Sequence, residues 1–248
     1  MTSAPLILSL ETATLGGSIV LTRGTNALAS RNGDPKVSHS NSLLADINDC
    51  LSEAEVKLAD LELFACASGP GSFTGLRIGI ATMKGLAATL NRPCAGVPTL
   101  NAIAHSAGTS NATVALLPAG RGEVFAQMFS VAGDEVVELD SAAHLSPLRL
   151  IERYGDTASL VWAGPGAEVH RALLQQHAGQ HDIEFVTQRA GSDFTQNCWR
   201  LAPPATNLAQ HVSALALILF SRGQTLGAES LKAIYVRPSD AEINQPWQ

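Results

Sequence analysis

The order of the apolar segments is the feature that most limits how this chain can fold. Short apolar runs separated by glycine-containing turns predict three successive strands, at residues 6–10, 18–22 and 27–30. Residues with helical or strand patterning then alternate, which predicts helix, strand, helix, strand and helix at 40–54, 63–67, 73–90, 94–97 and 99–107. The first part of the chain therefore reads as three strands followed by alternating helices and strands.

The same order begins again in the second part of the chain. Strands are predicted at 113–117, 123–130 and 135–139, followed by helix 147–153, strand 160–163, helix 166–177, strand 183–186 and helix 207–222. Residues 196–204 are irregular, and the role of 188–206 is not interpretable from the sequence. A Gly-Thr-Ser-Asn stretch separates the two parts, which predicts lobes at 1–108 and 109–248, with the last helix able to pack back across the lobes.

Two lobes of this order indicate an α/β protein with the actin/hexokinase/Hsp70-like (ribonuclease H-like) fold. Each lobe is expected to have the order βββαβαβα.

Composition excludes several classes of protein. Of the 248 residues, 46% are hydrophobic and 15% charged, which is not the composition of a disordered chain. The formal net charge of −6 disfavours unaided nucleic-acid binding. The four cysteines lack zinc-ligand spacing and are expected to be buried free thiols in a reducing compartment. Without a basic N-terminal region or an apolar run of ~20 residues, we expect a cytoplasmic protein with no membrane association.

One segment, G-P-G-S-F-T-G-L-R-I-G at residues 69–79, is more specific than the rest. It lies between a predicted strand and a long predicted helix, and its spacing matches neither a P-loop nor a dinucleotide-binding fingerprint. Its glycines allow close backbone approach, and the amides at a helix start can hold an anion. Gly75 and Gly79 also lie one helical turn apart, and Thr82, Gly85 and Ala88 extend this face of small side chains. Such a face lets another helix approach closely, either inside the lobe or in a partner. The residues alone leave helix packing and ligand binding as open alternatives.

This segment, the preceding Ser38-His39-Ser40 and the following Lys84-Gly85-Leu86-Ala87 resemble the bacterial TsaB (YeaZ) family. Gly96-Val97 and the stretch at 121–125 extend the resemblance, which is strong over residues 5–130 and weaker but collinear to the C-terminus. It implies the two-lobed fold already expected from the element order.

The resemblance also implies a function. Members of the family are non-catalytic subunits in the synthesis of N6-threonylcarbamoyladenosine at position 37 of tRNA. They pair with a homologous catalytic subunit, TsaD, and with the ATPase TsaE, and they form homodimers when alone. By this resemblance, tRNA is contacted only through the complex.

The residues at the catalytic positions agree with a non-catalytic role. Thr99 and Ile103 stand where catalytic relatives have a metal-binding His-x-x-x-His pair, and neither can replace an imidazole. His105 is isolated and is expected to be a surface or packing residue. Glu11 replaces the usual Asp of the first hairpin, and Pro118 replaces the Asp of the second. We therefore expect no bound metal and no catalytic residue. The alternative is a stand-alone nucleotide-dependent enzyme of the same fold, such as a small-molecule kinase or ATPase.

Two sets of candidate residues follow. We expect no tightly bound cofactor in this chain, and we expect that ATP or ADP can bind at the interface of the complex. The candidate nucleotide-binding residues are Glu11, Thr12, Gly69, Gly71 and Ser72. The expected partner interface is formed by the two helices near 40–54 and 73–90, through His39, Leu43, Leu44, Ile47, Leu51, Gly75, Arg77, Gly79 and Thr82.

Overall fold

The first sheet of the molecule has the predicted strands in the order β3-β2-β1-β4-β5. The computed structural model describes residues 4–34, 39–187 and 197–236. The strands are β1 (Leu6–Glu11), β2 (Ser18–Arg23), β3 (Asn26–Asn32), β4 (Leu63–Gly69) and β5 (Cys94–Pro98). The first three are antiparallel, and β4 and β5 run parallel to β1. This arrangement buries β1 and β4 in the middle of the sheet.

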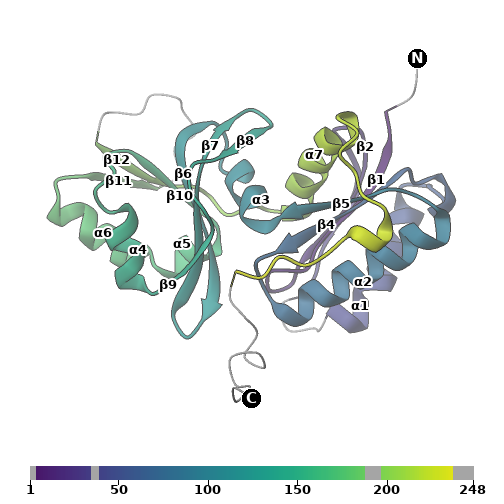
Figure 1. Ribbon diagram of the computed structural model, residues 1–248, viewed down its shortest axis with the longest axis horizontal. Coiled ribbons are helices and arrows are strands. Elements are labelled where there is room, and N and C mark those ends of the chain that lie inside the picture. The colour runs from purple at the N-terminus through teal and green to yellow at the C-terminus, as the bar shows by residue number, and fades with distance from the viewer. Residues whose placement is uncertain (1–3, 35–38, 188–196, 237–248) are drawn as a thin grey trace.

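Helices cover both faces of this sheet (Figure 1). The helices α1 (His39–Glu53) and α2 (Phe73–Leu90) lie on one face, with the short η1 (Leu58–Asp60) between them in the chain. Between the two sheets lie α3 (Thr99–Ser106) and α7 (Leu208–Ser221), which pack against each other. The bounds of α2 agree with the predicted helix.

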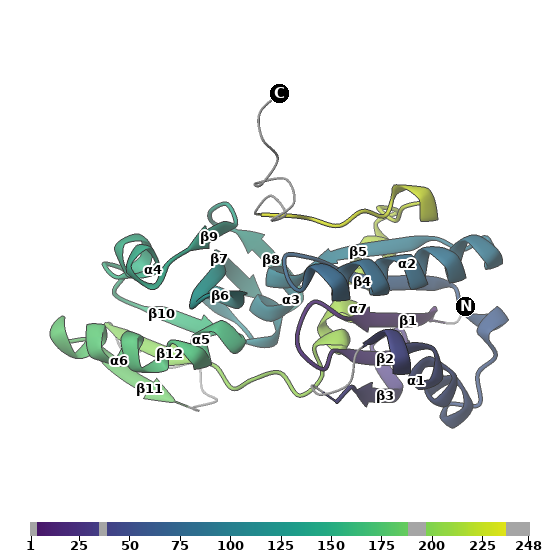
Figure 2. The same ribbon diagram turned by 90° about the horizontal axis from the view of Figure 1, so that it is seen from below.

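The second sheet has the order β11-β12-β10-β6-β7-β8, with β9 paired to β7 (Figure 2). Its strands are β6 (Ser110–Gly120), β7 (Glu123–Ala132), β8 (Glu135–Glu138), β9 (Ala143–Leu145), β10 (Leu160–Ala163), β11 (Glu184–Thr187) and β12 (Cys198–Leu201). Its outer helices are α4 (Pro147–Tyr154), α5 (Pro165–Val169) and α6 (Arg171–Gln180). The fold class predicted from the element order, two lobes of the actin/hexokinase/Hsp70-like type, is confirmed.

The second lobe differs from the predicted elements in three places. Residues 198–201, interpreted as irregular, form β12 between β10 and β11, so β11 is the edge strand. The three-residue strand β9 has too short an apolar pattern to be recognised. The predicted helix 166–177 is two helices that meet at His170, whose backbone leaves the helical region. The second lobe therefore has two strands more than the predicted order.

The last long helix, α7, returns to the first sheet, where it packs against β1 and β4. Asn207 fixes this return. Its side-chain oxygen accepts from the amide of Gln210 at the start of α7, while its Nδ2 donates to the carbonyl oxygens of Ile19 and Arg31 on two strands of the first sheet. The hydroxyl of Ser18 also accepts from the amide of Ala209.

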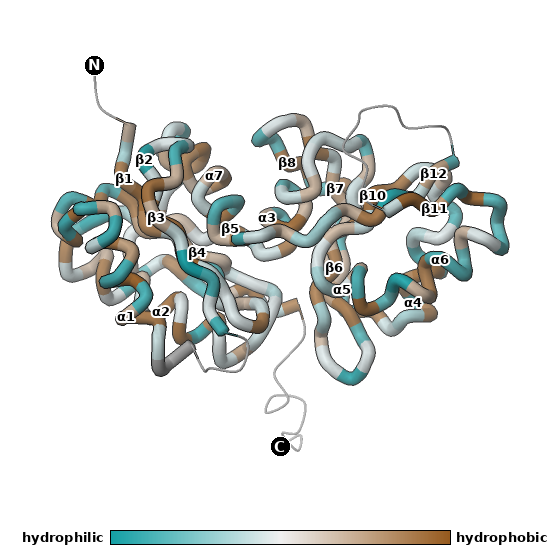
Figure 3. Tube along the Cα trace, turned by 180° about the vertical axis from the view of Figure 1, so that it is seen from behind, coloured by the Kyte–Doolittle hydropathy of each residue, from teal (hydrophilic) through white to brown (hydrophobic). Residues whose placement is uncertain are grey.

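One hydrophobic core runs through both lobes. It includes β1 and β4, the inner sides of α3 and α7, and inward residues of the second sheet such as Val161 and Ala163. The alternate residues of β10, Leu160 and Trp162, face a second core under α4 and α6. Hydrophobic residues accordingly line β1 in Figure 3. Because this core is shared, the two lobes are not packed independently of each other. The lobe boundary at residue 108 stays a prediction.

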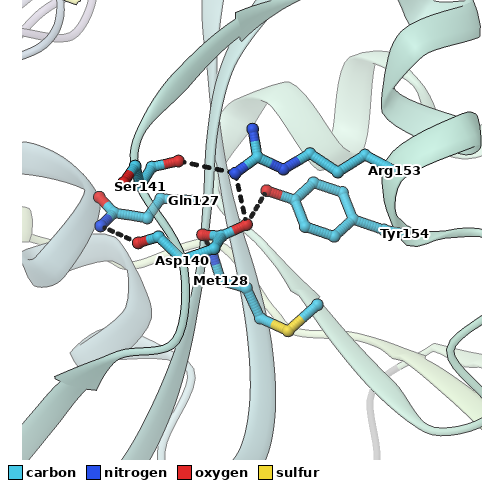
Figure 4. Close-up of polar contacts among 6 residues, drawn as sticks. All are labelled: Gln127, Met128, Asp140, Ser141, Arg153 and Tyr154. Atoms are coloured by element: carbon cyan, nitrogen blue, oxygen red, sulfur yellow. Dashed lines mark hydrogen bonds and ion pairs between the residues drawn. The ribbon is translucent and has the colours of Figure 1, made fainter.

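Asp140 holds the irregular segment after β8 against the outer helix α4 (Figure 4). Its carboxylate accepts from the Tyr154 hydroxyl and the Arg153 guanidinium, both at 2.8 Å, and from the amide of Met128 at 2.7 Å. Burial and this hydrogen bond raise the pKa of Tyr154. A single carboxylate thus joins α4 to the sheet.

The segment after α7 covers the edge of the first sheet, as Figure 1 shows in yellow. Leu226 and Cys94 exchange two backbone hydrogen bonds, and the amide of Ile234 donates to Ser68. Between them lies the short helix η2 (Ala228–Ser230). All four cysteines are buried and free, as expected from their spacing. Among the described residues, no helix is long and apolar enough to cross a membrane.

A histidine pair joins α3 to α7. His105 Nδ1 lies 2.8 Å from His211 Nδ1, and His105 Nε2 lies 3.1 Å from Asp134 on the turn before β8. Two facing ring nitrogens at this distance form a hydrogen bond only if one donates and the other accepts. Burial, and then the neighbouring His105, lower the pKa of His211 to about 4.

This pair predicts a loss of stability in acid. Between pH ~6.5 and pH ~4, His211 is protonated in the unfolded chain but neutral in the folded chain. The free energy of unfolding therefore falls by about 3 kcal/mol as the pH is lowered through this range. His211→Asn keeps a hydrogen-bonding side chain but does not titrate. Urea unfolding between pH 7 and 4 should show a shallower decline for the variant, and equal slopes would contradict the assignment.

Candidate functional site

The glycine-rich segment holds the start of α2 directly against the end of β1. A side chain at Gly75 would collide with the carbonyl oxygen of Thr12, and one at Gly79 with the Thr12 hydroxyl. The Thr12 hydroxyl donates to the carbonyl oxygen of Gly75 at 2.8 Å. Both glycines are buried. This face of α2 therefore serves close packing within the lobe, and ligand binding by the rest of the segment stays a prediction.

The backbone around the motif is also occupied. The amide of Ser72 donates to the carbonyl oxygen of Ala13 at 2.8 Å, and Ser72 caps α2 by accepting from the amide of Gly75. Gly71 lies against Ala13, and Gly69 lies against the carbonyl oxygen of Ile234. The loop therefore contacts three parts of the chain: the turn after β1, the start of α2 and the segment around Ile234.

A cavity of about 410 Å³ opens between the lobes, beside this loop. Its walls come from the turn after β1, the start of α2, α3, the end of β6, the start of α5 and the segment entering α7. The lining residues are Ala13, Thr14, Leu15, Ser72, Ile103, Ser106, Leu117, Pro118, Gly164, Pro165, Pro204, Ala205 and Leu208. Of the five candidate nucleotide-binding residues, Ser72 alone is in this lining. Glu11 and Thr12 instead line a separate, much smaller hollow beside α1.

Glu11 is buried at the end of β1, with 1% of its surface exposed. Its carboxylate accepts from the Thr14 amide at 2.7 Å and from the Thr14 hydroxyl at 2.5 Å. These bonds hold the turn after β1 in place. The carboxylate therefore acts within the chain in this structure, and its prediction as a nucleotide contact stays untested.

The positions that carry metal ligands in catalytic relatives are buried here. Thr99 is fully buried at the start of α3, and Ile103 is buried with part of its side chain lining the cavity. His105 makes the packing contact expected of it, with His211 and Asp134. No group of three or more His, Cys, Asp or Glu in the described part of the chain has a metal-binding arrangement. Pro118 also lines the cavity, so the second hairpin places a proline ring there in place of the aspartate carboxylate of the family.

The predicted partner interface divides into inward and outward residues. Leu43, Ile47 and Leu51 are buried in the core of their own lobe, and so are Gly75 and Gly79. For these five residues, the prediction of direct partner contact is wrong, because one side of each helix is used by its own sheet.

The outward residues stay predictions. Leu44 is 68% exposed, Arg77 is exposed with its guanidinium 3.8 Å from the centre of the Phe73 ring, and Thr82 is half-buried. The side chain of His39, at the start of α1, lies outside the described residues.

The small-residue face that the sequence assigned jointly to Gly75, Gly79, Thr82, Gly85 and Ala88 divides into a buried and an exposed part in the structure. Ala81, Gly85 and Ala88 recur at helical spacing on the exposed side of α2, and Gly85 has nothing within 4 Å of the place where a Cβ would lie. The spacing of these residues was a usable signal, but it could not be separated from the inward Gly75–Gly79 spacing without knowing which side met the sheet.

The two faces of α2 predict opposite effects of alanine. Gly75→Ala should lower the free energy of unfolding by about 1–3 kcal/mol, because the backbone of Thr12 cannot move away from the added methyl. Gly85→Ala should raise the free energy of unfolding by about 0.5–1 kcal/mol, because alanine has a higher helix propensity than glycine and its methyl group meets no other atom at this position. Urea unfolding of the two variants measures both effects, and a destabilised Gly85→Ala or a stabilised Gly75→Ala would contradict the assignment of faces.

Comparisons with known proteins match this chain consistently. The family model for TsaD, described as tRNA N6-adenosine threonylcarbamoyltransferase, matches residues 35–212. The tRNA threonylcarbamoyladenosine biosynthesis protein TsaB of Escherichia coli is 35% identical over 122 residues, which are 48% of this chain and 52% of the relative. The TsaB protein of Bacillus subtilis is 28% identical over 124 residues, which are 50% of this chain and 54% of the relative. The matches thus span about half the length of these curated relatives.

Solved structures extend the likeness over nearly the whole chain. YeaZ from Pseudomonas aeruginosa is 27% identical with a TM-score of 0.72, and the match covers 93% of this chain and 99% of that one. A second structure, described as an uncharacterized protein with similarity to peptidase YeaZ from Pseudomonas aeruginosa, is 28% identical with a TM-score of 0.73 and covers 94% and 100%. The resemblance first seen in the glycine-rich segment is confirmed: the chain belongs to the TsaD family and, within it, to the TsaB (YeaZ) proteins.

Proposed function

We propose that this protein is a non-catalytic subunit of the complex that makes N6-threonylcarbamoyladenosine at position 37 of tRNA. It pairs with the catalytic subunit TsaD, and the ATPase TsaE joins the pair. The protein acts in the cytoplasm and meets tRNA only through the complex. ATP or ADP binds at the interface of the complex, and this chain holds no cofactor tightly.

The observation that carries this proposal is the presence of Thr99 and Ile103 at the two positions where catalytic members of the family have metal-binding histidines. A hydroxyl at Thr99 and an alkyl group at Ile103 cannot supply two imidazole ligands to one metal. Both side chains are also buried, so a metal held by other groups would find no ligand here. The chemistry of the transfer is therefore assigned to a partner.

The outward face of α1 and α2 supports the pairing. Leu44 on α1 and the Ala81–Gly85–Ala88 face on α2 are exposed, while the opposite sides of both helices are packed on the sheet. Small residues allow the backbone of a second helix to approach closely, and an exposed apolar surface is typical of a protein interface. The same surface serves a second copy of the chain when TsaD is absent, so the two dimers compete by mass action.

Gly85→Arg tests this interface without disturbing the fold of the lobe. A side chain at Gly85 meets open space in the isolated chain, but in the complex it would bring a charge into the helix contact. We expect capture of purified TsaD to weaken by at least about tenfold. Gly179→Arg is the matched control, because Gly179 is also a helical glycine with nothing within 4 Å, on α6 of the other lobe. TsaD binding by Gly85→Arg equal to that of Gly179→Arg would reject this interface.

Reconstitution tests the function itself. The chain, TsaD and TsaE, supplied with tRNA, ATP and threonylcarbamoyl-adenylate as the group donor, should produce threonylcarbamoyladenosine in tRNA. The product is measured by mass spectrometry of the nucleosides, and leaving out the chain should remove most of it. Gly85→Arg should reproduce that loss, and Gly179→Arg should not. Turnover of ATP by the isolated chain, at a rate comparable to that of the complex, would favour the stand-alone enzyme instead.

A further inference from the structure

The exposed side of α2 carries a cation at one end. Thr74, Arg77, Ala81, Gly85 and Ala88 are all exposed and follow one another at spacings of three or four residues, so they form one stripe along the helix. Four of the five are small. A partner helix that packs along the small residues would therefore meet the guanidinium of Arg77 one turn before Ala81.

Aromatic rings hold this guanidinium in place. It lies 3.8 Å from the centre of the Phe73 ring, and the Phe73 ring lies 5.5 Å from that of Tyr235. Both rings are partly exposed, Phe73 at 39% and Tyr235 at 47%. A cation that rests on a ring face has lost rotational freedom before a partner arrives, which lowers the entropic cost of binding.

Tyr235 reaches Phe73 from the strap, residues 224–236, which lies beside α2 (Figure 1). The Nζ of Lys84 on α2 donates to the carbonyl oxygen of Glu229 in the strap at 3.3 Å. Leu231 anchors the strap, because its side chain is buried in the core of the first lobe. The strap therefore holds the Tyr235 ring against the start of α2.

The charge of Arg77 is not neutralised within the described part of the chain. No carboxylate there forms an ion pair with it. The first turn of α2 has no acidic residue, and the helix dipole disfavours a cation near the start of a helix. Because the neighbouring rings exclude water from one side of the guanidinium, an anion from another molecule would be attracted more strongly than by a fully solvated cation.

We propose that Arg77, positioned by Phe73 and Tyr235, forms an ion pair with a carboxylate of TsaD across the proposed interface. A planar guanidinium can bind both oxygens of one carboxylate. One cation among apolar and small side chains fits a protein contact, whereas nucleic acid is bound by several cations along the phosphate chain. This inference rests on the proposed function and adds the chemistry of the contact.

Arg77→Gln tests the ion pair, because glutamine keeps a polar side chain without the charge. We expect the affinity for purified TsaD, measured by biolayer interferometry with the full chain, to fall by at least about tenfold. Arg222→Gln is the matched control, because Arg222 is an exposed arginine at the end of α7 and forms no ion pair with a described residue. TsaD binding by Arg77→Gln equal to that of Arg222→Gln would reject the ion pair.

Ionic strength gives a second readout that belongs to charge alone. Raising the salt concentration from about 0.05 M to about 0.5 M should weaken the wild-type complex more than the Arg77→Gln complex, because salt screens the attraction. Equal salt dependence of the two complexes would contradict a contribution from the charge of Arg77.

Phe73→Leu tests the positioning role of the rings. It should weaken TsaD binding by about threefold, the size of a cation–π contact at an exposed site, and should add little to Arg77→Gln because the ring acts through the guanidinium. Additive losses in the double variant would show that Phe73 does not act through Arg77.

The outcomes separate this inference from the proposed function. If the wild-type chain does not bind TsaD, both are wrong. If Gly85→Arg weakens the binding and Arg77→Gln does not, this inference alone is wrong. A loss by Arg77→Gln confined to the homodimer, measured by sedimentation, would assign the carboxylate to a second copy. A loss confined to tRNA retention by the complex would assign a phosphate to Arg77, and either result overturns the proposal.

Discussion

The arrangement of the molecule depends on the hydrogen bonds of one side chain, Asn207. It caps α7 and at the same time binds carbonyl oxygens on two strands of the first sheet. The chain leaves the second lobe just before this residue, so the cap determines where α7 enters the first lobe. Because α7 then packs against α3, the two sheets share one core, and the position of each wall of the interlobe cavity follows from this contact.

A second constraint is the close approach of α2 to the end of β1. Glycine at 75 and 79 lets the helix backbone rest on Thr12, and the hydroxyl of Thr12 returns a hydrogen bond. This contact orients the helix about its own axis. With Gly75 and Gly79 turned inward, Ala81, Gly85 and Ala88 are turned outward. The internal packing and the surface proposed for the partner are therefore two sides of the same helix.

The partner surface and the interlobe cavity consist of different residues. The partner surface consists of exposed side chains on the outer helices of the first lobe. The cavity is formed by both lobes and lies behind the start of α2. The residues with catalytic counterparts, Thr99 and Ile103, are part of α3, which packs between the lobes. In this protein that helix contributes apolar packing to the cavity, where a metal-binding pair would need polar, accessible positions.

The sequence by itself determined the elements whose signals are local. The limits of α2 follow from Ser72 as a cap and from apolar residues at helical spacing, and the strands of the first sheet follow from short apolar runs bounded by glycine. The glycine-rich segment also identified the family. These signals depend on neighbours within one or two turns of chain, so they can be read without the fold.

Only the tertiary structure decided which side of each element is covered. The strand β12 was missed because it takes its place in the sheet from pairing with β10 and β11, and four residues carry too little pattern of their own. Leu43, Ile47 and Leu51 form a stripe that fits equally well against a partner or against the chain's own sheet. The same holds for Gly75 and Gly79, whose role depends on Thr12, 63 residues from Gly75 in the chain. Spacing along a helix gives the existence of a face, but the strand that meets that face is chosen by contacts between distant parts of the chain.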